Sequence, residues 1–294
     1  MTDAFVRFWG TRGSIPTPGH RTRRYGGNTS CVSLRVGNAL YVCDGGTGLR
    51  ELGVSLMQEQ PNDAIEAHLF FSHTHWDHIQ GFPFFMPAYS SKNTLYVYDA
   101  TREERVRQLL LGQMRSDYFP VAFSDLGSTI ISRALETGET LIDGVCVRHI
   151  EQVHPGRSFA YSFNVAGKKI VYATDSELDL SIQNVSECDA NRDRLRQLPA
   201  ELVKFVQGAD LLIADGQYTD EEYATKVGWG HARASTVVDL AVQAGVGQLA
   251  IFHHDPMHAD EDVDQLLAVA RSRVELHGAR ISVFGAREGL ELRI

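Results

Sequence analysis

A run of three histidines and an aspartate stands out in this 294-residue chain, His-Thr-His-Trp-Asp-His at residues 73–78. At the end of a strand, side chains two residues apart point the same way, so His73 and His75 can converge on one metal ion. Asp77 and His78, at the following turn, can reach a second ion. Imidazole and carboxylate groups are common ligands of divalent metals. The run therefore predicts two adjacent metal ions.

Two metal ions need more ligands than this run supplies, and three further residues each follow a predicted strand: His154, Asp175 and His253. A carboxylate has two oxygens and can bridge ions about 3.5 to 4 Å apart, so Asp175 is the predicted bridge. We expect one ion to be held by His73, His75, His154 and Asp175, and the other by Asp77, His78, His253 and Asp175. Such ligands suit zinc, manganese and iron alike, and zinc is the metal we expect first.

Short apolar or alternating runs predict the strands that would position these ligands. They cover residues 5–8, 31–36, 39–43, 68–71, 95–98, 145–150, 159–165, 169–173 and 249–252. Apolar residues at three- and four-residue spacing predict helices at 47–58, 102–110, 201–206, 235–244 and 262–274. We expect sheets inside and helices outside, in one compact domain over residues 1–294. The polar segment 176–199 predicts a surface excursion bordering the site.

The formal net charge of −9 argues against long nucleic acid as a partner, because docking it requires basic residues to neutralise phosphates. No stretch is long and apolar enough for a membrane helix, and no secretion signal is visible, so we expect a cytoplasmic protein. The basic segment formed by Arg12 and residues 20–24 either faces an anionic ligand or is a solvated loop.

Taken together, these residues resemble the metallo-β-lactamase superfamily, and within it the phosphodiesterase branch that includes ribonuclease Z and small cyclic-phosphate phosphodiesterases. The resemblance passes through residues 8–16, 28–30, 43–48, 73–78, 154, 174–175, 230–231 and 252–256. It implies an α/β fold, a four-layer αββα sandwich with the site along one edge of its sheets. It also implies that Asp44 anchors the histidine-rich run; the other interpretation is a simple turn aspartate.

The same resemblance assigns His231 as the residue that protonates the leaving oxygen, with Asp215 as the acid that orients and charges it. Alternatively, His231 only introduces the helix predicted at 235–244. The family usually has a histidine before the acid, where this chain has Ala214. Asp77 is expected to act both as a ligand and as a catalytic residue.

The expected activity is hydrolysis of a small phosphodiester, such as a cyclic nucleotide, by a hydroxide that bridges the two ions. His154 and Asp175 lie only a hairpin apart, which leaves no room for the long arm with which ribonuclease Z grips transfer RNA. The alternatives are a carboxyl-ester or lactam hydrolase, which would need no proton donor at His231, and a non-enzymatic ligand sensor. Left open are a homodimer and the roles of Arg157, residues 21–24, His254 and His258.

Overall fold

The computed structural model describes residues 4–100 and 104–294 and contains two seven-stranded sheets. The first sheet has the order β14-β1-β2-β3-β4-β5-β6. Its strands are β1 (Ala4–Gly10), β2 (Cys31–Val36), β3 (Ala39–Cys43), β4 (Glu66–Phe70), β5 (Thr94–Asp99), β6 (Thr129–Ala134) and β14 (Glu291–Arg293). The second has the order β13-β12-β11-β10-β9-β8-β7. Its strands are β7 (Thr140–Ile142), β8 (Val145–Gln152), β9 (Ser158–Val165), β10 (Lys168–Ala173), β11 (Leu211–Asp215), β12 (Gln248–Phe252) and β13 (Ser282–Gly285).

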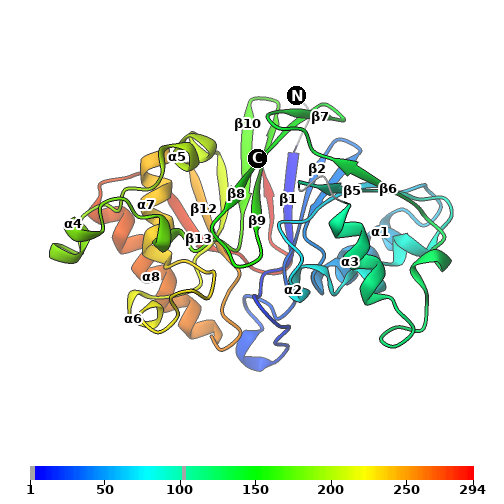
Figure 1. Cartoon of the computed structure of the whole chain (residues 1–294), viewed down its shortest axis with the longest axis horizontal. Helices are drawn as coiled ribbons and strands as arrows, with labels where there is room; N and C mark the ends of the chain where they lie inside the picture. The colour runs from blue at the N-terminus through cyan, green and yellow to red at the C-terminus, as the bar shows by residue number, and fades with distance from the viewer. Residues whose placement is uncertain (1–3, 101–103) are drawn as a thin grey trace.

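Helices cover the outer face of each sheet (Figure 1). On the side of the first sheet are α1 (Gly48–Glu59), α2 (Trp76–Ile79) and α3 (Arg105–Gln113). On the side of the second are α4 (Val185–Ala190), α5 (Ala200–Val206), α6 (Asp220–Tyr223), α7 (Ala234–Ala244) and α8 (Asp260–Leu276). The result is the αββα sandwich expected from the sequence.

Three apolar clusters hold the layers together, one between the sheets and one beneath each group of helices. The alternation of side chains along a strand explains how one strand serves two of them. In β1, Val6 and Phe8 enter the cluster between the sheets, whereas Trp9 packs beneath the helices of the first sheet. Strand β11 is buried along its whole length, because it lies inside the parallel part of its sheet with layers on both faces.

Strand direction brings the site together. Strands β3 to β6 run parallel to one another, and so do β10 to β13. Strand β9 is antiparallel to both β8 and β10, so β8 runs in the same direction as β10. The carboxyl ends of these strands meet at the edge of the sandwich that is lowest in Figure 1, where α2 lies. Ligands commonly bind beyond the carboxyl ends of parallel strands.

The predicted strands and helices are all present, with bounds that shift by a few residues; residues 102 and 103 of the helix predicted at 102–110 lie outside the described residues. The strands β6, β7, β11, β13 and β14 were not among the predicted runs. No helix in the described part of the chain has the length and apolar character needed to span a membrane.

Candidate metal centre

The predicted ligands all lie at this one edge of the sandwich. They are His73 and His75 after β4, Asp77 and His78 in α2, His154 after β8, Asp175 after β10 and His253 after β12. Their ligand atoms form two groups, and within each group the atoms lie within 4.8 Å of one another. The structure therefore brings together residues that are up to 180 positions apart in the sequence.

The first group consists of His73, His75 and His154. Nδ1 of His75 lies 3.2 Å from Nε2 of His154. Nδ1 of His154 donates a hydrogen bond of 2.9 Å to the carbonyl oxygen of Gly230. The proton therefore sits on Nδ1, and the lone pair of Nε2 is free to face the other two histidines. These three imidazoles present nitrogen atoms to one point.

The second group consists of Asp77, His78, Asp175 and His253, all of them buried. Nε2 of His78 and Nε2 of His253 lie 3.2 and 3.1 Å from the same oxygen, Oδ2 of Asp77. That oxygen also accepts a hydrogen bond of 2.7 Å from the backbone N–H of Ser14, which fixes the carboxylate against the N-terminal loop.

Asp175 lies between the two groups. Its Oδ1 is 3.3 Å from Nε2 of His78 and also 3.3 Å from Nε2 of His253. Its Oδ2 faces the other way, 3.6 Å from Nε2 of His73. The two oxygens thus address different groups, which is the arrangement that a bridging carboxylate needs.

If the cluster holds metal ions, some of its buried polar atoms should lack a hydrogen-bond partner in the protein. Nε2 of His73 is buried and has no hydrogen-bond partner among the described residues. Burial lowers the pKa of His73 and of His154, which keeps these rings neutral, and a metal ion binds the neutral ring. Nitrogen and carboxylate donors in two adjoining groups suit divalent ions, so the residues present fit such ions.

Asp44 orients the cluster from behind, at the end of β3. Its carboxylate accepts hydrogen bonds from the backbone and hydroxyl of Ser72 and from the hydroxyl of Tyr172. Asp44, Asp175 and His253 have φ angles of 60°, 52° and 59°, in the left-handed region. Strained backbone of this kind concentrates at functional sites, where the surrounding structure must hold it in place.

His231 and Asp215 form a pair directly beside the second group. Nδ1 of His231 donates a hydrogen bond of 2.7 Å to Oδ2 of Asp215, and the His231 ring stacks on that of His253 with centroids 4.9 Å apart. Burial opposes the charged ring, but the Asp215 carboxylate outweighs it and raises the pKa of His231 to about 9. Nδ1 of His231 also lies 3.9 Å from Oδ2 of Asp175, so a second carboxylate favours the charged form of the ring.

Sequence reasoning missed Glu177, whose carboxylate holds the loop that carries His231. It accepts hydrogen bonds of 2.7 Å from the backbone N–H groups of Gly228 and Gly230 and one of 2.8 Å from the hydroxyl of Tyr223. Its side chain is buried, so the segment predicted as a surface excursion begins beneath the site. The spacing of Glu177 two residues after Asp175 is the only signal the sequence offered.

Several basic residues have structural roles. Neither alternative expected for Arg12, contact with an anionic ligand or a place in a solvated loop, is correct, because its side chain is wholly buried and donates to the carbonyl oxygens of Gly26, Asp255 and His258. His254 is also buried and contacts the carbonyl oxygen of Ala286.

Three other residues whose roles the sequence left undecided lie in ion pairs. His258 pairs with Glu222, Arg24 with Asp264, and Arg157 with Glu151. Trp76 is 71% exposed. It is the first residue of α2 and follows His75 directly.

A family model described as a beta-lactamase superfamily domain matches residues 41–254. This match covers most of the chain and all of the cluster. The chain therefore belongs to the metallo-β-lactamase superfamily, and it is a hydrolase of that superfamily. The family implies divalent metal ions, which the donor set of the cluster fits.

Ribonuclease Z of Methanosarcina mazei is 26% identical over 324 aligned residues, which cover 98% of this chain and 97% of that protein. Among solved structures, the metallo-β-lactamase fold protein YhfI of Bacillus subtilis has a TM-score of 0.69 at 17% identity. The alignment covers 100% of this chain and 100% of that chain. A diphosphatase of the PhnP family has a TM-score of 0.65 at 14% identity, with 99% of this chain and 98% of that chain covered. The two solved structures show a shared fold.

Proposed function

We propose that the protein is a phosphodiesterase with two divalent metal ions, zinc first among them, and that it hydrolyses a small phosphodiester. The observation that carries this proposal is the His231–Asp215 pair beside Asp175. Hydrolysis of a phosphodiester expels an alkoxide, which needs a proton, and a charged histidine in this position supplies it. The pairing supports the acid role over that of a residue that only introduces α7.

His73, His75 and His154 would hold one ion, and Asp77, His78 and His253 the other, with Asp175 between them. The bound ions would acidify the attacking water and neutralise charge on the phosphoryl oxygens. Oδ2 of Asp77 is held by the N–H of Ser14, so this carboxylate can orient the water as well as act as a ligand.

In the reaction the water oxygen forms a bond to phosphorus and the bond between phosphorus and the leaving oxygen breaks. His231 gives its proton to that leaving oxygen, while Asp215 stabilises the charged ring before transfer. The attacking water gives up one proton to solvent, and His231 takes a proton from solvent before the next turnover. The products are an alcohol and a phosphomonoester. A general acid of this kind contributes about 10² to 10⁴ in rate.

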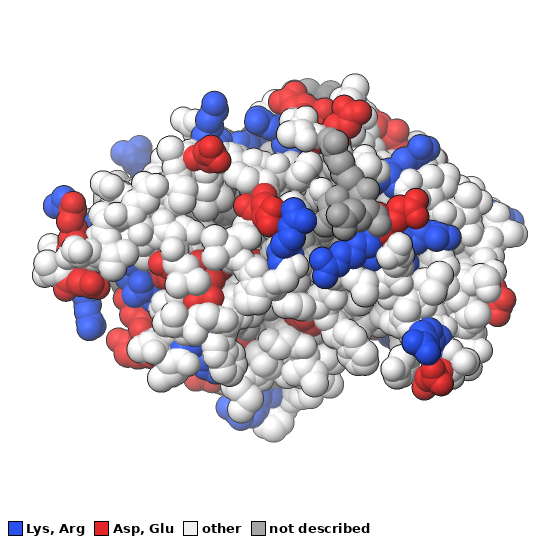
Figure 2. All heavy atoms as spheres, in the orientation of Figure 1, with Lys and Arg blue, Asp and Glu red and all other residues white. Residues whose placement is uncertain are grey.

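A small substrate is favoured by the path of the chain between His154 and Asp175. Strands β8, β9 and β10 follow one another through short turns, so this stretch carries no long arm. On the face drawn in Figure 2, the described basic and acidic side chains are interspersed and form no continuous basic band. The net charge of −9 also disfavours long nucleic acid.

The test is to measure bound metal by elemental analysis and then assay bis(p-nitrophenyl) phosphate, 2′,3′- and 3′,5′-cyclic nucleotides, a precursor transfer RNA, a chromogenic lactam and an acyl ester. We expect two ions per chain, hydrolysis of the small diesters, and loss of activity on treatment with a chelator. Faster turnover of the lactam or acyl ester would overturn the phosphodiesterase assignment. Preferential cleavage of the precursor transfer RNA would overturn the small-substrate assignment.

A further inference from the structure

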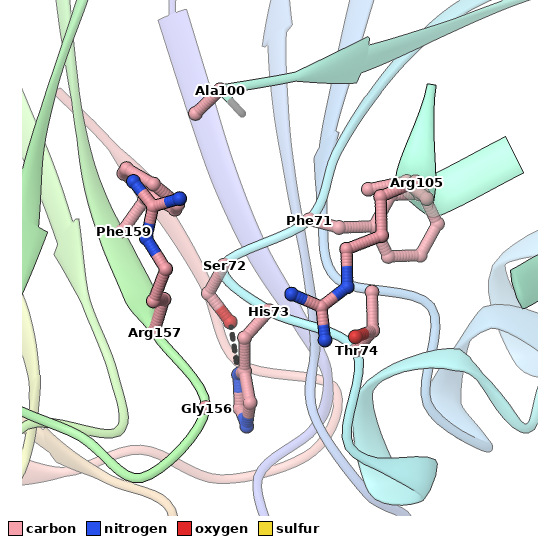
Figure 3. A pocket seen from close by; sticks show the side chains of 10 residues that line it. Phe71, Ser72, His73, Thr74, Ala100, Arg105, Gly156, Arg157 and Phe159 are labelled. Atoms are coloured by element: carbon pink, nitrogen blue, oxygen red, sulfur yellow. Dashed lines mark hydrogen bonds between the residues drawn. The ribbon is translucent and has the colours of Figure 1, made fainter. Parts of the chain in front are cut away.

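A histidine that binds a metal ion through one ring nitrogen carries its proton on the other, and this second nitrogen usually donates to an acceptor. Three of the proposed ligands have such a partner. Nδ1 of His73 lies 3.1 Å from the hydroxyl oxygen of Ser72 (Figure 3), and that hydroxyl gives its own proton to Asp44. Nδ1 of His78 lies 2.7 Å from the Asp44 carboxylate, and Nδ1 of His154 lies 2.9 Å from a backbone carbonyl oxygen.

The second nitrogen of His253 has no such partner. Nε2 of this ring faces the second metal group, 3.1 Å from Oδ2 of Asp77 and 3.3 Å from Oδ1 of Asp175. Nδ1 points away from the group and is buried, and none of the described residues, 4–100 and 104–294, gives it a hydrogen bond. A buried donor without an acceptor is destabilising, so this nitrogen needs an acceptor close by.

Gln217 is a buried side chain that also lacks a partner. It lies two residues after the end of β11, and the residue is only 1% exposed. Its backbone N–H donates a hydrogen bond of 3.1 Å to Oδ1 of Asp215, which fixes its backbone next to the proposed acid pair. Within the described ranges, neither the oxygen nor the nitrogen of its side-chain amide has a hydrogen-bond partner.

Gly13 shows that the two unpartnered groups lie close together. Its backbone N–H donates a hydrogen bond of 2.9 Å to the carbonyl oxygen of His254, which holds the N-terminal loop against the end of β12. A Cβ atom on Gly13 would lie 2.5 Å from Nδ1 of His253 and 2.9 Å from Nε2 of Gln217. Two polar atoms so close to one point are within reach of a single bridging water, and rotation of the amide turns its oxygen toward the imidazole.

We propose that Gln217 is a positioning residue for His253. Its amide oxygen accepts the proton of Nδ1, directly or through one buried water, and so fixes the tautomer in which Nε2 faces the second metal group. The inference rests on the proposed metal centre and deepens it, since it assigns the support of the last ligand to a residue that binds neither metal nor substrate.

Zinc affinity tests this inference, measured on the full chain by competition with a chromogenic chelator. Gln217→Met removes both polar atoms of the amide while keeping an unbranched side chain of similar length. We expect one of the two zinc affinities to fall about 10- to 100-fold in this variant and the other to be retained. Gln217→Glu keeps an acceptor oxygen and should retain both affinities.

A stability measurement distinguishes positioning from packing. Urea denaturation of the metal-free chain should show no loss in Gln217→Met, because an apolar group in place of an unpaired buried amide is neutral or stabilising. Gln243→Met is the matched control. The amide of Gln243 donates a hydrogen bond of 2.7 Å to the carbonyl oxygen of Arg196 and accepts one of 3.2 Å from the N–H of Leu198. This control should lose stability and keep both zinc affinities.

The outcomes separate failure of this inference from failure of the proposed function. Weaker zinc binding in Gln217→Met but not in Gln217→Glu supports the inference even if no diester is hydrolysed. Unchanged affinities in Gln217→Met, or an equal loss in Gln217→Met and Gln217→Glu, overturn it and leave the proposed function standing. A wild-type chain that binds no divalent ion overturns both.

Discussion

Nδ1 of His78 donates a hydrogen bond of 2.7 Å to Oδ2 of Asp44, and both side chains are buried. The bond fixes which nitrogen of the ring faces the cluster, because the carboxylate holds the proton on Nδ1 and leaves Nε2 free. Asp44 is not itself in either ligand group. If His78 is a ligand as proposed, Asp44 would hold it in the orientation and tautomer that metal binding requires.

We therefore expect Asp44→Asn to weaken metal binding by about 10- to 100-fold, the range found when such supporting groups are removed. Competition with a chromogenic chelator measures the affinity. Asp143→Asn is the control, because Asp143 makes the equivalent contact of 2.8 Å with a histidine outside the cluster, His68. Equal affinities in Asp44→Asn and wild type would show that Asp44 does not support the centre.

Removal of the proposed acid should matter most where the leaving group is poor. We expect His231→Ala to lower kcat by about 10² to 10⁴ on a diester with an alkyl leaving group, and by much less on a p-nitrophenyl diester, whose leaving group needs no proton. Steady-state kinetics on the two substrates measures the difference. His20→Ala, at an exposed position, is the control. The acid role is refuted by an equal loss on both substrates.

The pH profile should report the same residue. The pKa of His231 is raised to about 9 once the effect of Asp215 overcomes that of burial, so the ring keeps its proton below this pH and loses it above. Bound divalent ions would repel the charged ring and lower this value, so we expect kcat to fall with rising pH in a limb at or below pH 9. In Asp215→Asn this limb should move to lower pH. A limb that stays in place would mean that another group titrates.

Glu177 should be important for stability as well as for activity. Glu177→Gln removes the charge and turns an N–H donor toward backbone N–H groups, so we expect a loss of about 2 to 4 kcal/mol in the free energy of unfolding. Urea denaturation measures this loss, and faster hydrogen exchange at residues 228–230 would locate it. Glu187→Gln, in an exposed pair with Arg194, should cost less than about 0.5 kcal/mol. Similar losses in the two variants would contradict the role of Glu177.

Two neighbouring glycines offer a matched pair of substitutions. Gly228 and Gly230 have φ angles of +86° and +91°, so alanine at either position strains the backbone, by about 1 kcal/mol or more. At Gly230 alone, the added Cβ would meet Nδ1 of His154 at 2.4 Å, whereas at Gly228 it would meet nothing within 4 Å. We expect Gly230→Ala to lose metal affinity and Gly228→Ala to retain it, as measured by elemental analysis after dialysis. Equal metal content would show that His154 tolerates displacement.

The sequence by itself determined the parts of this protein that depend on neighbouring residues. The histidine-rich run at 73–78 and the alternating strands 31–36 and 159–165 are local patterns, because side-chain direction in a strand follows from spacing alone. His154, Asp175 and His253 were predicted because each follows such a strand. The family resemblance then supplied the order of the layers.

Only the tertiary structure decided which distant groups meet. The two oxygens of Asp175 face different histidines, and Glu177 holds a loop some fifty residues further on. Arg12, basic and set among glycines, is wholly buried because carbonyl oxygens from the two ends of the chain converge on it. These relationships depend on how two sheets pack, and packing brings together residues that no pattern along the chain connects.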